Sequence, residues 1–223
     1  MHREIKLTKD GSHTIALTGT DITYHSHHGA IAESMHVYIE AGLLPLMSRS
    51  TAKPLHILEI GFGTGLNALL SLREAISHQQ PIHYTTIELF PLTETEIDLI
   101  NHGKCLSMEN EFAQLHSSPW EKNVHIHELF CLHKSKISLL ELKDLHSLDC
   151  IYFDAFAPTD QPELWTQAVF ENLFGMLAPQ GVLVTYCSKS VIRKAMEAAG
   201  FIIQKIPGPH GKRDMVRAGK KSV

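Results

Sequence analysis

The sequence lacks the features that mark membrane proteins, secreted proteins and small zinc domains. No apolar run approaches the roughly 20 residues of a membrane-spanning helix. Residues 1–6 lack the apolar core of a secretion signal. The four cysteines are widely spaced without a CxxC pair, which argues against a zinc knuckle or a disulfide framework. We therefore expect a cytoplasmic protein with reduced thiols and no membrane partner.

Metal-ligand patterns are also missing, although the chain holds 16 histidines. The tract HSHH at residues 25–28 could supply loop ligands, but a metal site would also need a fixed histidine pair with a carboxylate or cysteine partner. We predict scattered surface histidines and no metal.

The 223 residues, 43% hydrophobic and 20% charged, fit one soluble domain with a sizeable core. The net charge of -4 hides a gradient, because residues 189–223 carry nine Lys/Arg against two acidic residues. Such a basic end could steer a phosphate-bearing partner, whereas a solvated tail is the commoner explanation. Both interpretations stay open at this point.

From residue 55 onward, apolar β-branched runs alternate with helical patterns, which predicts an α/β fold with a mostly parallel sheet. The expected strands are residues 56–60, 83–89, 124–130, 148–156, 181–187 and 201–206, and the expected helices are residues 64–77, 93–101, 163–177 and 190–199. The segment PGPHG at 207–211 leaves no room for a crossover helix, so residues 214–218 should return antiparallel. This terminal hairpin is the shape shared by Rossmann-like methyltransferases.

Before residue 55 the pattern changes. Residues 13–18 and 21–24 alternate around Gly19-Thr20 like a small β-hairpin, and residues 31–41 have helical spacing. We expect an N-terminal appendage, residues 1–54, packed on a methyltransferase core, residues 55–223, as a single folded unit.

The segment EIGFGTG at residues 59–65 lies between a predicted strand and a predicted helix. Glycines allow a sharp turn and a close backbone approach, and the helix start offers unpaired N–H groups. GxGxG after an acidic residue fits S-adenosylmethionine better than the GxGxxG of dinucleotide sites. Glu88, which ends the second strand, could accept both ribose hydroxyls. The alternative is a glycine-rich turn without a ligand.

The segment DAFAP at residues 154–158 ends the fourth strand, where open α/β sheets place their ligands. Methyl transfer to nitrogen needs an aligned amine and a group that orients it or takes its proton, and Asp154 is the candidate. Alternatively, Asp154 caps the following turn. Phe156 and Trp165 could stack on an unpaired base, although Trp165 could equally belong to the core.

Further motifs accompany these: YHS at residues 24–26 with Gly29 and Glu33, WT at 165–166, AGF at 199–201 and GKRDM at 211–215. Together with LEIGFGTGLN at 58–67 and DAFAP, they make residues 21–218 resemble the methyltransferase domain of the MnmC family. That family acts on the modified wobble uridine of certain tRNAs.

The resemblance implies methyl transfer from S-adenosylmethionine to the exocyclic amine of 5-aminomethyl-2-thiouridine, giving 5-methylaminomethyl-2-thiouridine, with the tRNA anticodon loop as partner. It implies a catalytic role for Asp154 as the group that takes the proton. The cofactor would be held by Glu59, Gly61, Gly63, Gly65, Asn67 and Glu88. The substrate would be contacted by Tyr24, Glu33, Phe156, Trp165, Lys212 and Arg213, the last two at anticodon-stem phosphates.

The chain departs from the family pattern in three places. Bifunctional members carry a flavin-dependent oxidase domain next, but this chain ends at Val223, so we expect no FAD. Whether a separate oxidase or modification enzyme is a partner stays open. Residues 129–133 offer no acidic residue for adenine, and His25 replaces a second aromatic. The competing hypotheses are a methyltransferase for a small-molecule or protein amine and a non-catalytic Rossmann-like binding module.

Overall fold

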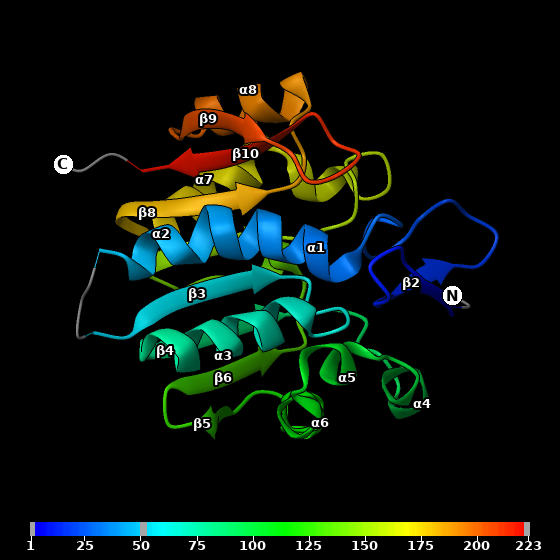
Figure 1. The fold of residues 1–223 in the computed structure, drawn as a ribbon. Helices are drawn as coiled ribbons and strands as arrows, with labels where there is room; N and C mark the ends of the chain where they lie inside the picture. The colour runs from blue at the N-terminus through cyan, green and yellow to red at the C-terminus, as the bar shows by residue number, and fades with distance from the viewer. Residues whose placement is uncertain (1–2, 50–52, 221–223) are drawn as a thin grey trace.

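The computed structural model describes residues 3–49 and 53–220, and within them the central sheet has eight strands. Their order is β5-β6-β4-β3-β7-β8-β10-β9 (Figure 1). The strands are β3 (Leu55–Ile60), β4 (Ile82–Ile87), β5 (Asn123–His127), β6 (Phe130–Ser135), β7 (Leu148–Phe153), β8 (Leu177–Thr185), β9 (Ile202–Pro207) and β10 (Asp214–Gly219). β6, β4, β3, β7 and β8 pair in parallel. The predicted α/β Rossmann-like fold is confirmed.

The predicted C-terminal hairpin is also confirmed. β10 pairs antiparallel with both β8 and β9 and so lies between them. The connection from β9 to β10 is a short loop that carries Lys212 and Arg213. The last residues of the basic segment, 221–223 with Lys221, lie outside the described residues.

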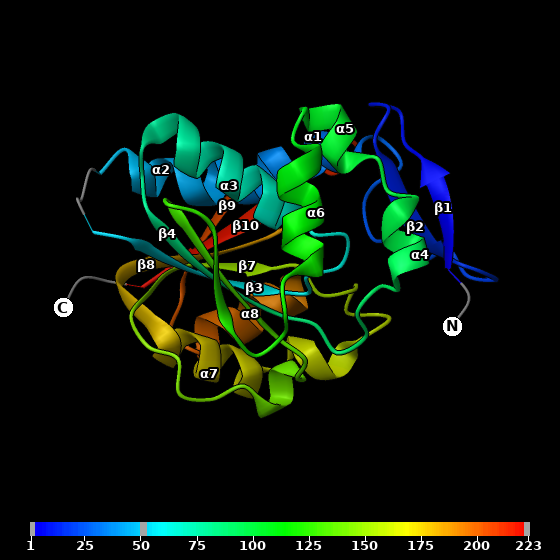
Figure 2. The same cartoon turned by 90° about the horizontal axis from the view of Figure 1, so that it is seen from below.

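Helices cover both faces of the sheet (Figure 2). On one face lie α1 (Ala30–Ser34), the π-helical segment η1 (Met35–Leu43), α2 (Leu44–Met47) and α3 (Leu66–His78), and on the other lie α7 (Gln167–Met176) and α8 (Ser190–Ala198). The shorter elements are α4 (Glu94–Asp98), α5 (His102–Leu106), α6 (Glu109–Ser117), η2 (Leu139–Glu141) and η3 (Pro162–Trp165). None of the helices in the described ranges is long and apolar enough to cross a membrane.

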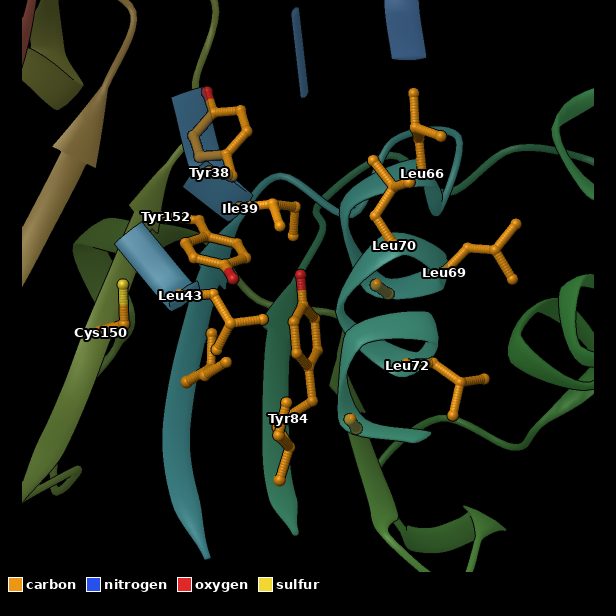
Figure 3. Packing of buried hydrophobic residues seen from close by; sticks show 14 of the residues in the cluster. Tyr38, Ile39, Leu43, Leu66, Leu69, Leu70, Leu72, Tyr84, Cys150 and Tyr152 are labelled. Atoms are coloured by element: carbon orange, nitrogen blue, oxygen red, sulfur yellow. The ribbon is translucent and has the colours of Figure 1, made fainter. Parts of the chain in front are cut away.

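The helical segment 30–47 is part of the core. Tyr38 is 2% exposed and its ring lies 5.3 Å from that of Tyr152 in β7, in the cluster that Figure 3 shows between η1, α3 and the sheet. A side chain at Gly42 would come within 3.0 Å of Val184, so glycine lets η1 lie directly on the strands. The predicted division into residues 1–54 and 55–223 stays a prediction, and residues 1–2 and 50–52 lie outside the described part of the chain.

The local structure differs from the prediction in three places. The expected third strand, 124–130, is two antiparallel strands, because the chain turns at residues 128–129 and β6 becomes the parallel neighbour of β4. The N-terminal hairpin joins β1 (Arg3–Leu7) to β2 (His13–Leu17), and residues 21–24 contribute a single bridge between Ala16 and Thr23. The helices α5 and α6 were not expected.

The division of the expected third strand into β5 and β6 changes which residues lie at the end of that strand. Residues 129–133, which offer no acidic residue for adenine, lie just before and inside β6 rather than after it. A carboxylate does stand at the tip of β6: Glu121 accepts hydrogen bonds from the Lys136 backbone N–H at 2.6 Å and from the Ser135 hydroxyl at 2.9 Å. Glu121 comes from the loop before β5, so the strand-end pattern could not indicate it.

Candidate active site

The glycine loop between β3 and α3 requires glycine at the three glycine positions of its GxGxG pattern for two reasons. Gly61, Gly63 and Gly65 have φ values of 93°, 50° and 71°, a region that side chains strain. A Cβ at Gly61 would also lie 3.0 Å from the Asp154 carbonyl oxygen, and one at Gly65 would lie 2.9 Å from His116. The loop is thus a tight cradle of backbone atoms, which fits close approach of a ligand.

Glu88, directly after β4, holds this loop from the neighbouring strand. Its carboxylate accepts hydrogen bonds from the Gly63 N–H at 3.1 Å and from the Phe90 N–H at 2.8 Å. The side chain is half-buried, and each oxygen keeps lone pairs for other donors. The structure therefore brings Glu88 and the glycine loop together, as the sequence predicts.

Two histidines support the loop from α5 and α6. The His102 ring hydrogen-bonds the Thr64 hydroxyl at 3.0 Å, and the His116 ring hydrogen-bonds the Thr64 carbonyl at 3.1 Å. Burial lowers the pKa of His116 to about 4 and that of His102 well below its ordinary value, so both rings are neutral. His25, 8% exposed, lies 6.0 Å from His102, ring centre to ring centre. The prediction of scattered surface histidines is wrong for these three.

Asp154 follows β7 and lies beside the glycine loop, half-buried. Its Oδ1 accepts a hydrogen bond from the Tyr38 hydroxyl at 2.6 Å, and its Oδ2 accepts one from the Asn67 amide at 2.9 Å. Burial raises the pKa of Asp154 to about 6, and the two hydrogen bonds oppose that rise. The result is an oriented carboxylate that gains and loses a proton near neutral pH.

Glu59 and Asn67, both expected to bind the cofactor, are buried beside the loop, and their cofactor role stays a prediction. Asn67 is 3% exposed and directs its amide to Asp154. Glu59 is fully buried near Tyr84 and Thr86, yet its carboxyl oxygens have no well-formed hydrogen bond within the described residues. Burial raises the pKa of Glu59 well above its ordinary value and so favours the neutral form of the group.

The aromatic residues divide into two groups. The Tyr24 ring meets the Phe156 ring edge-on at 5.2 Å, and it lies 3.3 Å from where a Cβ on Gly63 would be, so this half-buried pair borders the glycine loop. Trp165 is 4% exposed and packs 4.7 Å from Phe153. Its indole N–H donates to the Phe156 carbonyl at 2.9 Å. In this arrangement Trp165 supports Phe156, and neither of its faces is open for a base.

The two basic substrate candidates also differ. Arg213 is exposed. Lys212 is turned inward: its ammonium forms an ion pair with Glu33 at 2.8 Å and lies 3.9 Å from the ring centre of Tyr186. The Lys212 ammonium is thus engaged by Glu33 and Tyr186, whereas Arg213 is open to solvent, and the phosphate role expected of both stays a prediction. Tyr186, which follows β8, was missed by the sequence reasoning because a lone strand-end tyrosine carries no signal.

A family model described as S-adenosyl-L-methionine-dependent methyltransferase matches residues 100–221. The chain belongs to this family. The cofactor expected from the glycine loop is therefore S-adenosylmethionine, as predicted. Within the described residues, no group of three or more histidines, cysteines or acidic residues could hold a metal ion.

Curated relatives match nearly the whole chain but extend well beyond it. The tRNA 5-methylaminomethyl-2-thiouridine biosynthesis bifunctional protein MnmC of Pseudoalteromonas atlantica is 28% identical over 96% of this chain and 33% of its own length. The protein of the same name from Leptospira interrogans is 31% identical over 88% of this chain and 32% of its own length. The chain thus spans about a third of these relatives, and the resemblance to an MnmC methyltransferase domain is confirmed.

Solved structures agree on the fold. MNMC2 from Aquifex aeolicus superposes with a TM-score of 0.81 at 23% identity, covering all of this chain and 71% of that one. Spermidine synthase from Thermotoga maritima superposes with a TM-score of 0.60 at 17% identity, covering 99% and 70%. At these identities the likeness concerns the fold alone.

Proposed function

We propose that this chain transfers a methyl group from S-adenosylmethionine to the exocyclic amine of 5-aminomethyl-2-thiouridine at the tRNA wobble position, giving 5-methylaminomethyl-2-thiouridine. The names of its relatives supply the product nucleoside and the tRNA, and the family supplies the methyl donor. The observation that carries the proposal is Asp154, a carboxylate with a pKa of about 6 that Tyr38 and Asn67 orient beside the glycine loop.

The residues of the loop fit the cofactor. Gly61, Gly63, Gly65 and Glu88 would hold it, since they offer a bare backbone turn and a carboxylate at adjacent strand ends. When bound, the cofactor supplies an electrophilic methyl group on a sulfonium. Glu59 and Asn67 act from behind, Glu59 as neutral packing and Asn67 as a donor that positions Asp154.

Asp154 can remove the proton that keeps the substrate amine from reacting. A primary amine with a pKa near ~10 is an ammonium at neutral pH and has no lone pair to attack with. At pH 7 Asp154 is mostly ionised and accepts one proton from the ammonium nitrogen. The freed lone pair would then accept the methyl group, whose bond to sulfur would break and leave S-adenosylhomocysteine, while Tyr38 and Asn67 keep the carboxyl group of Asp154 fixed.

The nucleobase and the tRNA backbone use different surfaces. Tyr24 and Phe156 border the loop and offer aromatic surface for the uracil ring. Trp165 fixes the Phe156 segment through its hydrogen bond to the Phe156 carbonyl. Arg213, exposed on the β9–β10 loop, is the candidate contact for phosphates of the anticodon stem, and we place the anticodon loop at this end of the sheet.

The test is methyl incorporation into bulk tRNA from cells that lack this activity. We incubate the purified chain with S-adenosylmethionine labelled in the methyl group and analyse the nucleosides. Label in 5-methylaminomethyl-2-thiouridine is the expected result. No label in tRNA, with label appearing in a parallel incubation with a tRNA-free extract, would instead assign the chain to a small-molecule or protein amine.

A further inference from the structure

The ammonium of Lys212 occupies a small cage near Asp154. Lys212 lies on the β9–β10 loop, Glu33 on α1 and Tyr186 directly after β8, so three distant segments meet there. The Lys212 nitrogen lies 2.8 Å from a Glu33 carboxylate oxygen and 3.9 Å from the centre of the Tyr186 ring. A carboxylate with an aromatic face is a strong site for an ammonium group when water is largely excluded.

The walls of this cage are held in place independently of Lys212. The second Glu33 oxygen accepts a hydrogen bond from the Ser26 N–H at 2.7 Å, and the Glu33 side chain is only 10% exposed. The Tyr186 hydroxyl donates to the carbonyl of Ala155 at 2.9 Å. The site is thus preformed, while the Lys212 side chain is 36% exposed and sits on a flexible four-carbon stem.

The cage also lies within electrostatic reach of the proposed base. Glu33 raises the pKa of Asp154 and Lys212 lowers it, after burial and the two hydrogen bonds have acted. Ala155, which anchors the Tyr186 hydroxyl, is the next residue in the chain. An ammonium in the cage therefore interacts electrostatically with the carboxylate that would take its proton.

We propose that Glu33 and the ring of Tyr186 form a subsite for the protonated amine of the substrate, and that Lys212 fills this subsite until the substrate arrives. The proposal rests on the proposed function, because it requires an amine substrate. The incoming ammonium displaces Lys212 toward solvent, pairs with Glu33 and loses one proton to Asp154. A substrate with a neutral hydroxyl in place of the amine gains nothing from this exchange.

The experiment measures binding rather than methyl transfer. The probes are two free nucleosides, 5-aminomethyluridine and its neutral counterpart 5-hydroxymethyluridine, titrated into the full chain by calorimetry in the presence of S-adenosylmethionine. In Lys212→Ala the subsite is empty, so the affinity for 5-aminomethyluridine should rise by about fivefold or more, and that for 5-hydroxymethyluridine should not change.

Two further variants serve as controls. Lys212→Arg keeps a cation in the cage and should leave both affinities near those of the unmodified chain. Glu33→Gln keeps the size of the side chain but removes its charge, and it should lower the affinity for 5-aminomethyluridine about tenfold without affecting 5-hydroxymethyluridine. The Glu33→Gln variant still tests the proposed subsite if thermal unfolding shows that Lys212→Ala folds poorly.

The opposite results would overturn the proposal. If Lys212→Ala leaves amine binding unchanged or weaker, and Glu33→Gln lowers the melting temperature without affecting amine selectivity, the ion pair is a structural link between α1 and the β9–β10 loop. The outcome is separable from that of the tRNA assay. Amine selectivity without tRNA methylation would overturn the tRNA assignment alone, whereas tRNA methylation without amine selectivity would overturn the subsite alone.

Discussion

The neighbouring strands β3 and β7 each place a carboxyl group near their carboxyl ends, and the two groups differ in burial, hydrogen bonding and pKa. Glu59, the next-to-last residue of β3, is fully buried without a well-formed hydrogen bond in the described residues, and its pKa lies well above the ordinary value. Asp154, just past the end of β7, is half-buried and holds two hydrogen bonds, and its pKa is about 6. Two register positions separate a fully buried carboxyl group, whose pKa burial raises well above the ordinary value, from a half-buried one with a pKa of about 6.

In this fold, the residues that support the site and the residues that can react lie in different places. Residues inside the strands and behind the glycine loop are shielded from solvent, and they support the site from within the core. Residues just after the strands reach the opening and can meet both the cofactor loop and a substrate. Asn67 connects the two regions, since it lies beside Glu59 and donates to Asp154.

The largest effect should come from Asp154→Asn, which removes the base but keeps the shape. We expect methyl transfer to slow by roughly 10²–10⁴-fold. Affinity for S-adenosylmethionine should change little. Single-turnover kinetics and calorimetry separate these quantities, and equal losses in both would mean that Asp154 chiefly holds the cofactor.

The pH dependence of methyl transfer by the unmodified chain should follow the protonation of Asp154. A base with a pKa of about 6 is ionised above that pH and protonated below it. The value of kcat/KM should therefore fall about tenfold for each pH unit below 6. A profile that stays flat between pH 5 and 7, in a range where the chain remains folded by circular dichroism, would exclude Asp154 as the base.

Tyr38→Phe should raise the pKa of Asp154 and so shift it in the same direction as that of Glu59. The Tyr38 hydroxyl donates to the charged form of the carboxylate at 2.6 Å, so its removal destabilises that form. We expect the acid limb of the profile to move upward by about one pH unit, the effect of losing roughly 1.4 kcal/mol of stabilisation. A limb that moves downward or stays in place would show that this hydrogen bond does not set the pKa of Asp154.

Glu59→Gln should have the smallest effect, because burial favours the neutral form of the Glu59 carboxyl group and glutamine is a neutral group of similar size. We expect the free energy of unfolding in urea to change by about 1 kcal/mol or less, and cofactor affinity to change only a few-fold. A loss of cofactor binding by orders of magnitude would mean that Glu59 is ionised and contacts the cofactor.

The glycine loop and Asp154 could be predicted because their signals are local. A GxGxG pattern between a strand and a helix can be recognised from a few consecutive residues, and so can an aspartate at a strand end. The supports of the loop could not be predicted, since α5 has only five residues and His116 reaches Thr64 across 52 positions in the chain. Lys212 shows the same limit: its sequence context is basic, but its partner Glu33 lies 179 positions away.

The most direct test of the central claim is the content of the wobble nucleoside in cells from which this gene is deleted. The account predicts that 5-methylaminomethyl-2-thiouridine disappears from tRNA, that 5-aminomethyl-2-thiouridine accumulates, and that the unmodified chain but not Asp154→Asn restores the methylated form. Unchanged levels of both nucleosides after deletion, or full restoration by Asp154→Asn, would contradict it.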